Sequence, residues 1–271
     1  MKIKIAVCQL RTELRQEETM KKAEAMVRAA AEKGADFVVL PEMYNCPYSK
    51  GYFRKYASLG HESAVEAMSS WARELGVYIV GGSIPECEDG KIYNTCFVFD
   101  RQGRQIARHR KVHLFDVDIP GMSFKESATF TPGEEITVFD TEYGKMGAAV
   151  CFDVRFPELF RAMAVRGAQV IFLPAQFNMA TGPAHWEMTL RSRAVDNELF
   201  MVAAAAARYE GFDYECWGHS MIVDPYGVIL SSCEAEETII FSEIDLERVE
   251  QVRAQLPTFL KLRRELYKVA E

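Results

Sequence analysis

Apolar runs and segments of helical periodicity alternate along the chain. The first run, Lys2–Leu10, alternates apolar and polar residues and indicates a strand. The segment Glu17–Lys33 then places apolar residues at helical spacing, and Gly34 is a natural helix stop. Phe37–Leu40 is short and continuously apolar, which is typical of a strand buried on both faces. These patterns predict a protein in which strands and helices alternate.

The same order continues to the end of the chain. Helices are predicted over Ala64–Leu75, Pro157–Arg166, Ala184–Glu198 and Leu246–Gln255. Strands are predicted over Val77–Val80, Lys145–Val150, Val170–Leu173, Phe200–Ala205 and Ile239–Ile244, and two hairpins over Tyr93–Asp100 with Gln105–Arg110 and over His219–Val223 with Val228–Ser231.

Two segments resemble each other closely. KGADFVVLPE (Lys33–Glu42) and RGAQVIFLPA (Arg166–Ala175) share a helix-ending Gly-Ala, an apolar strand and a Leu-Pro exit. Each is followed by a helix–strand unit and later by a hairpin. The repeat indicates an α/β fold of two related halves, packed sheet against sheet with helices outside.

Composition narrows the class of protein. The 271 residues are 49% apolar and contain no Pro-, Gly- or Ser-rich linker, so we expect residues 1–271 to form a single domain. The 32 Lys and Arg residues face 39 Asp and Glu residues, and a net charge of −7 argues against nucleic acid as a partner. The longest apolar stretch, Phe200–Ala207, is too short to span a membrane, because a span needs about 20 residues.

The cysteines point to a reducing compartment. They are seven in number and scattered, without a CxxC pair, which argues against a disulfide framework and against a zinc cluster. The N-terminal MKIKIAVCQL runs directly into a strand pattern and does not resemble a signal peptide. We therefore expect a cytoplasmic protein without a membrane anchor or a metal.

Cys151 has the most suggestive context of the seven cysteines. It ends the apolar strand GAAVC and precedes a helix that begins at Pro157. A cysteine on such a sharp strand-to-helix turn exposes its sulfur to backbone N–H groups and to the positive end of a helix dipole. The alternative is a buried cysteine that serves as a small apolar residue.

Three charged residues are candidates to act with this thiol. Glu42 follows a buried strand, and a desolvated glutamate there could take the proton of the thiol, although a solvated loop acid is the simpler reading. Lys111 ends the basic run Arg108–Lys111 and could stabilise an oxyanion. The alternative is that the whole run is the solvated edge of a strand. Glu126 lies in the long connection Val112–Glu135, where a surface position is the usual one.

The residues alone leave other chemistries open. A Cys–His dyad with His113 or His185 is possible. No GxGxxG, GxxxxGK[ST] or HExxH motif is found, so nucleotide-binding and metalloprotease readings lack support.

Taken together, these motifs resemble the nitrilase superfamily of carbon–nitrogen hydrolases. The resemblance is carried by LPEMYNCPY with Glu42, HRKVHLFDVDIPG with Lys111, FKES with Glu126 and GAAVCFDVRFPEL with Cys151, and by further motifs such as FTPG, TGPAHWE and WGHSMIVDPYG along nearly the whole chain. It implies a four-layer αββα sandwich of two halves related by a pseudo-twofold axis.

The resemblance also implies roles for individual residues. Cys151 would be the nucleophile that forms a thioester, Glu42 the general base, and Lys111 with the backbone N–H of Phe152 the oxyanion donors. Glu126 would orient Lys111 or the incoming water. No cofactor is implied.

NCPY, HLFDVDIPG and FNMATGPAHWE are most similar to the omega-amidase branch, which hydrolyses the terminal amide of dicarboxylic monoamides such as 2-oxoglutaramate and 2-oxosuccinamate. Arg155 is the candidate for binding the distal carboxylate of these substrates, with a helix-start ion pair to Glu158 as its alternative role. The pocket walls implied by the resemblance are Tyr48, Phe115, Phe177 and Thr181.

Alternatives remain within and outside the superfamily. GHSMIVDPYG also resembles amidases that act on deaminated glutathione, and hydrolysis of N-carbamoyl amino acids is another possible activity. A thiol-bearing scaffold without turnover is the reading from a different class. The resemblance further implies a homodimer or larger homo-oligomer, with the C-terminal tail 257–271 contacting a partner subunit.

Overall fold

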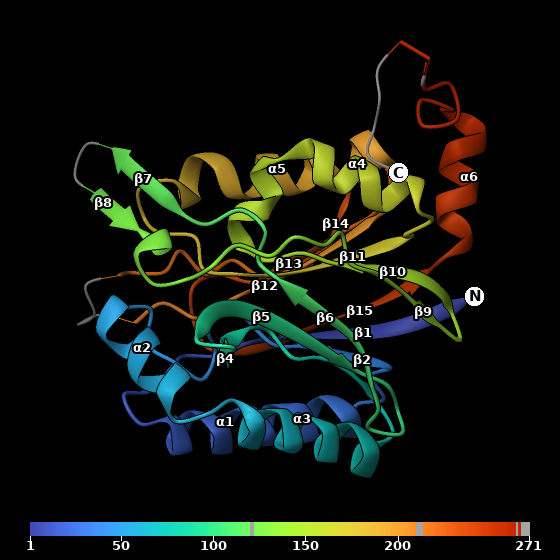
Figure 1. Cartoon of the computed structure of the whole chain (residues 1–271). Coiled ribbons are helices and arrows are strands. Elements are labelled where there is room, and N and C mark those ends of the chain that lie inside the picture. The colour runs from blue at the N-terminus through green and yellow to red at the C-terminus, as the bar shows by residue number, and fades with distance from the viewer. Residues whose placement is uncertain (120–121, 210–213, 264, 267–271) are drawn as a thin grey trace.

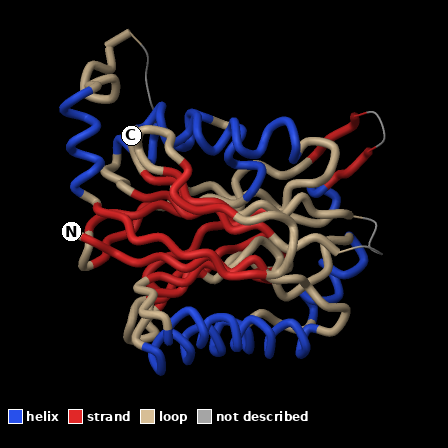
Figure 2. The backbone as a smooth tube through the Cα atoms, turned by 180° about the vertical axis from the view of Figure 1, so that it is seen from behind, coloured by secondary structure: helices blue, strands red, loops and turns tan. Residues whose placement is uncertain are grey.

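Two β-sheets lie face to face, and helices cover the outer side of each (Figures 1 and 2). The computed structural model describes residues 1–119, 122–209, 214–263 and 265–266. The four-layer α/β sandwich predicted from the sequence is confirmed.

The first sheet has the strand order β15-β1-β2-β3-β5-β4, and β6 pairs with the other side of β5. Its strands are β1 (Lys2–Gln9), β2 (Phe37–Val39), β3 (Tyr78–Val80), β4 (Ile84–Glu88), β5 (Lys91–Phe99), β6 (Gln105–Arg110) and β15 (Thr238–Asp245). Helices α1 (Gln16–Glu32) and α3 (Glu62–Leu75) cover its outer face, and α2 (Lys50–Ser58) lies at one end of this layer (Figure 1).

The second sheet has the order β14-β13-β12-β11-β10-β9. Its strands are β9 (Val138–Thr141), β10 (Gly144–Ala148), β11 (Val170–Ala175), β12 (Phe200–Ala205), β13 (Met221–Val223) and β14 (Ile229–Ser232). Helices α4 (Pro157–Val165) and α5 (Gly182–Asn197) cover it, and α6 (Glu247–Gln255) follows β15 (Figure 1). The repeated segments become β2 and β11, one strand in the interior of each sheet.

The core fills the space between the two sheets. Phe37 of β2 stacks on Phe172 of β11 with ring centroids 5.4 Å apart, so the two repeated strands meet across the interface. A second apolar cluster lies between the first sheet and the helices α1 and α3. The interior strands of the first sheet are covered on both faces. β1 is therefore buried at nearly every position after its first residues, although its sequence predicted alternating buried and exposed positions.

Most predicted elements are present with shifts of a residue or two at their ends. The helix stop predicted at Gly34 has a positive φ of 77°, and Gly76, directly after the helix predicted to end at Leu75, has a φ of 65°. The pattern gave no prediction for α2, β4 or β9. It also gave none for the β7–β8 hairpin (Asp116–Ile119 and Met122–Lys125), which lies inside the predicted long connection.

The first part of the C-terminal tail packs on its own chain. Glu198 Oε1 accepts hydrogen bonds from the backbone N–H groups of Thr258 and Phe259, at 3.0 and 3.3 Å. The ring of Phe259 is 8% exposed and belongs to the main core. Residues 264 and 267–271 of the tail lie outside the described residues, and its contact with a partner subunit stays a prediction.

None of the helices in the described ranges combines the length and the apolar character needed to cross a bilayer.

Candidate active site

Cys151 stands on a strained turn where β10 gives way to helix. Its φ is 45°, in the left-handed region that β-carbon-bearing residues rarely adopt. A short 3-10 helix, Cys151–Arg155, begins at this residue and leads into α4 at Pro157. N–H groups in the first turn of a helix have no partner within it, so the N–H of Phe152 is available to a group placed at the sulfur. The sharp strand-to-helix turn predicted at Cys151 is therefore present, and we call this turn, Cys151–Arg155, the elbow.

A buried lysine joins the two candidate glutamates. Lys111 Nζ lies 2.9 Å from Glu42 Oε1 and 2.9 Å from Glu126 Oε2, and all three side chains are fully buried. The sulfur of Cys151 lies near enough to Glu42 and Lys111 for their charges to shift its pKa, Glu42 upward and Lys111 downward. The structure therefore brings together all four residues that the sequence singled out. Burial rules out the solvated readings of Glu42, Lys111 and Glu126.

Neighbouring amides fix both carboxyl groups in place. Asn94 Nδ2 donates to Glu42 Oε1 at 2.9 Å and to Glu126 Oε1 at 3.2 Å. The second oxygen of Glu42 accepts from the backbone N–H of Gln176 at 2.9 Å, and that of Glu126 accepts from Phe115 N at 2.6 Å. Carboxylates held by these hydrogen bonds are already oriented before the reaction, so little conformational entropy is lost when they act.

Burial and neighbouring charges shift the pKa values of Cys151, Glu42 and Lys111 in directions that favour proton transfer from the thiol to Glu42. Burial raises the pKa of Cys151 well above its usual value, and the adjacent Glu42 carboxylate adds to the effect, so the resting sulfur is a thiol. Burial also raises the pKa of Glu42, against the lowering effect of Lys111, which makes it a stronger base than a solvated carboxylate. Although burial acts to lower the pKa of Lys111, the charges of Glu126 and Glu42 hold it above its usual value, and the lysine stays charged.

Neither histidine considered for a dyad interacts with the thiol. His113 Nδ1 lies 2.8 Å from Asp153 Oδ1, and its ring stacks on Phe156 with centroids 3.6 Å apart. His185 Nδ1 lies 3.2 Å from Arg155 Nη1. Among the described residues, Glu42 is the carboxylate near Cys151 that can serve as its base.

Asp153 ties the strand-to-helix turn at Cys151 to the segment that carries Lys111, a role that was not predicted from the sequence. The Asp153 carboxylate is fully buried and lies 3.0 Å from His109 Nε2 and 2.8 Å from His113 Nδ1, two histidines that flank Lys111. It also accepts from the backbone N–H of Val150 at 3.0 Å. The signal in the sequence is the spacing of the histidines, two residues to either side of the lysine, which only the fold connects to Asp153.

Asp153→Asn should destabilise the protein by about 3–5 kcal/mol, because an amide group would turn donors toward donors in a buried site. Although burial alone would raise it, the two histidines hold the pKa of Asp153 below its usual value. Its contribution is therefore complete above the pKa of the unfolded chain, near 4, and is lost as the pH falls toward the lower folded-state pKa.

Urea unfolding of wild type and Asp153→Asn measures both effects. The difference between them should be constant from about pH 7 to 5 and shrink below about pH 4. The matched control is Asp140→Asn at an exposed side chain, which should change stability by less than about 0.5 kcal/mol. A gap that does not depend on pH would contradict this account.

A small cavity opens beside the sulfur. Cys151, Phe152 and Arg155 line it from the side of the strand-to-helix turn. Three of the four predicted pocket residues are also in its wall, namely Phe115, Phe177 and Thr181. Tyr48 instead lies behind Tyr214, with ring centroids 4.4 Å apart, and lines the neighbouring hollows together with it.

Arg155 points into this cavity and not toward the start of α4. Among the described residues no carboxylate lies within ion-pair distance of it, and Glu158 is exposed and does not pair with it. The guanidinium lies over the rings of Phe177 and Phe152, 5.0 and 5.7 Å from their centroids. The helix-start ion pair considered for Arg155 is therefore wrong, and an uncompensated cation faces the space next to Cys151.

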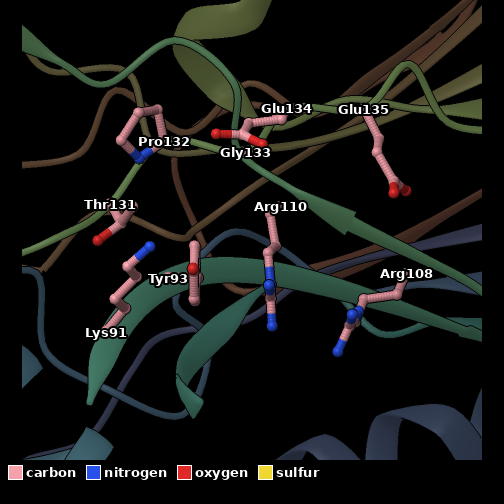
Figure 3. Close-up of a pocket in the computed structure, with 9 residues that line it drawn as sticks. All are labelled: Lys91, Tyr93, Arg108, Arg110, Thr131, Pro132, Gly133, Glu134 and Glu135. Carbon is pink, nitrogen blue, oxygen red and sulfur yellow. The ribbon is translucent and has the colours of Figure 1, made fainter. Parts of the chain in front are cut away.

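A larger hollow of about 170 Å³ lies elsewhere, on the outer face of β6 (Figure 3). Arg108 and Arg110 line it, whereas the alternate residues His109 and Lys111 point inward to the active centre. Both arginines are already paired with Glu86 and Glu88 at 2.6–3.1 Å. The charges of these two arginines are thus neutralised, and the lining of the hollow contains no cysteine or serine.

In the described residues no group of three or more His, Cys, Asp and Glu side chains is arranged to hold a metal ion.

Comparison with known proteins identifies the family. The family model for carbon–nitrogen hydrolases matches residues 4–254. The chain belongs to the carbon–nitrogen hydrolase family. The omega-amidase NIT2 of Danio rerio is 43% identical over 269 residues, which cover 99% of this chain and 97% of the relative. These findings confirm the expected superfamily and the expected class of enzyme, an amidase.

Solved structures of carbon–nitrogen hydrolases share the fold. The Nit3 protein of Saccharomyces cerevisiae, described as a member of branch 10 of the nitrilase superfamily, superposes with a TM-score of 0.90 at 39% identity, covering 97% of this chain and 96% of its own. An amidase from Nesterenkonia sp. AN1, whose active-site cysteine has undergone Michael addition of acrylamide, superposes with a TM-score of 0.80 at 25% identity, covering 94% of this chain and 98% of its own.

Proposed function

We propose that this carbon–nitrogen hydrolase releases ammonia from the terminal amide of short dicarboxylic monoamides, such as 2-oxoglutaramate and 2-oxosuccinamate. The observation that carries the proposal is the position of Arg155, a guanidinium without a carboxylate partner among the described residues, in the same small cavity as Cys151. The similarity to omega-amidases over nearly the whole chain supports it.

In the first half of the reaction, the sulfur of Cys151 attacks the amide carbonyl carbon while the Glu42 carboxylate accepts the thiol proton. A base is needed because burial keeps the sulfur protonated at rest. The carbonyl oxygen becomes an oxyanion held by Lys111 Nζ and the backbone N–H of Phe152. When the C–N bond breaks, Glu42 returns the proton to the leaving nitrogen, and ammonia departs.

In the second half, water attacks the thioester carbonyl and gives its proton to Glu42. The C–S bond breaks, the acid product leaves, and the proton returns to the sulfur. Glu126 holds Lys111 toward the oxyanion through its 2.9 Å contact. Balanced in this way, the cycle consumes one water and needs no cofactor.

The lining of the cavity supports a short substrate, because Cys151 and Arg155 both line this one small cavity. In such a substrate the amide would lie at Cys151 and the distal carboxylate at Arg155, which can donate two parallel hydrogen bonds to it. Deaminated glutathione and N-carbamoyl amino acids are larger or place the carboxylate differently, and a panel of these amides tests the alternatives.

Arg155→Gln should lower kcat/KM for 2-oxoglutaramate by about 10- to 100-fold, since a hydrogen bond to a charged group contributes about 1.5–3 kcal/mol. Ammonia release at increasing substrate concentration measures the effect. The control Arg15→Gln, at an exposed arginine before α1, should leave kcat/KM unchanged. If wild type releases no ammonia from these amides, or if Arg155→Gln matches wild type, the proposed substrate class is wrong.

The homodimer and the cytoplasmic location implied by the resemblance remain predictions. Exposed apolar side chains gather where α5 meets the β13–β14 turn, including Met188, Val195, Tyr226 and Val228. The turn is next to the helix, because Arg191 Nε donates to Gly227 O at 2.9 Å. A second copy of the chain would cover this surface.

A further inference from the structure

The side chain of His185 makes a contact that the reaction described above does not use. His185 lies in the first turn of α5, and its Nδ1 is 3.2 Å from Arg155 Nη1. A guanidinium nitrogen can only donate, so Nδ1 must accept the hydrogen bond. The imidazole is therefore neutral, with its proton on Nε2, when it holds Arg155.

Arg155 has few other constraints on its orientation. The rings of Phe177 and Phe152 support the flat face of the guanidinium, but a ring face does not fix rotation about the axis perpendicular to it. Within the described part of the chain, the bond to His185 is the hydrogen bond that the guanidinium makes. One edge of the guanidinium is thereby taken, and its remaining N–H groups are left for a ligand.

The helix that carries His185 is itself firmly held. Trp186, the next residue, is 1% exposed and its Nε1 donates to the carbonyl oxygen of His219 at 2.6 Å. At the start of the helix, a β-carbon on Gly182 would lie 2.4 Å from the ring of Trp217, so the backbone approaches that ring as closely as only glycine allows. The backbone that carries His185 is thus held in place by the packing of its neighbours.

We propose that His185 is the positioning residue that orients Arg155 toward the distal carboxylate of the substrate and so sets the preference for dicarboxylic monoamides. The inference rests on the proposed function, because it assigns Arg155 the task of binding a carboxylate. His185 does not touch the reacting amide, and it acts through the guanidinium. Losing it should weaken the recognition of the carboxylate while the chemistry at Cys151 continues.

Two substrates separate recognition from chemistry. Succinamate carries the amide and the distal carboxylate, and methyl succinamate has the same chain with an uncharged ester in place of the carboxylate. For His185→Leu, kcat/KM for succinamate should fall about tenfold, mainly through KM, because one hydrogen bond is lost. With methyl succinamate the variant should stay within about twofold of wild type. His185→Asn, which offers an oxygen near the position of Nδ1, should recover most of the loss.

A double-mutant cycle tests whether His185 acts through Arg155. In an Arg155→Gln background, His185→Leu should have no further effect on the preference for succinamate over its ester. Equal losses of both substrates in His185→Leu, or a full effect of His185→Leu in the Arg155→Gln background, would overturn the inference.

The same measurements separate this inference from the proposed function. If Arg155→Gln abolishes the preference for succinamate but His185→Leu and His185→Asn both keep it, only the role of His185 is wrong. If wild type shows no preference, or Arg155→Gln does not change it, the proposed substrate class is itself wrong.

Discussion

Cys151→Ala should lower ammonia release from 2-oxoglutaramate by at least about 10⁴-fold, because it removes the atom that forms the covalent intermediate. Lys111 and the N–H of Phe152 would still be in place, but without the sulfur they have no tetrahedral intermediate to stabilise. The fold should be intact, since alanine fits the space of a small side chain. Ammonia release and a thermal melt of the same sample measure the two expectations together.

The other cysteines supply the control for this variant. Cys87 is exposed on β4, and Cys87→Ala should keep full activity. Turnover by Cys151→Ala close to that of wild type would exclude the proposed mechanism and favour a thiol-independent reaction. Full loss of activity in a His113 variant, with Glu42→Gln still active, would instead point to a Cys–His dyad.

The parts of the fold that could be predicted are those specified by local pattern. The helix ends at Gly34 and Gly76 follow from residues that tolerate a positive φ, and the elbow follows from an apolar strand that runs into Pro157. β4, for which the pattern gave no prediction, contains Pro85. Its place at the end of the strand order explains why proline is tolerated there, since an edge strand can lack one N–H donor.

Burial of charged residues could not be read from local pattern. Glu126 follows a polar segment, and the sequence favours a surface position for it. It is buried because Lys111, Asn94 and the N–H of Phe115 satisfy its carboxylate, and these partners meet only in the folded chain. The resemblance to the superfamily supplied what local pattern lacked for this residue.

The orientation of Arg155 shows a similar limit. An arginine three residues before a glutamate at a helix start is compatible with a local ion pair, and only the structure shows that the guanidinium turns away. Its partner His185 comes from a helix 30 residues later in the chain. Contacts of this kind depend on how α5 packs against the elbow, which periodicity does not specify.

Lys111→Met should both stop the reaction and destabilise the protein. Turnover should fall at least about 10³-fold, because an oxyanion donor of this kind contributes about 100- to 1,000-fold and Glu42 would also lose the cation that keeps it ionised. The free energy of unfolding should fall by about 3–5 kcal/mol, since Glu42 and Glu126 would remain buried without a positive partner. Ammonia release and urea unfolding at pH 7 measure the two losses.

A second substitution separates the two losses. In Lys111→Met with Glu126→Gln, one of the two buried charges is gone, so most of the lost stability should return while activity stays absent. Lys145→Met, at a half-exposed lysine in β10, is the matched control and should change neither property. Full activity in Lys111→Met would rule out Lys111 as an oxyanion donor. Unchanged stability would mean that one of the two glutamates takes up a proton and stays neutral once the lysine is removed.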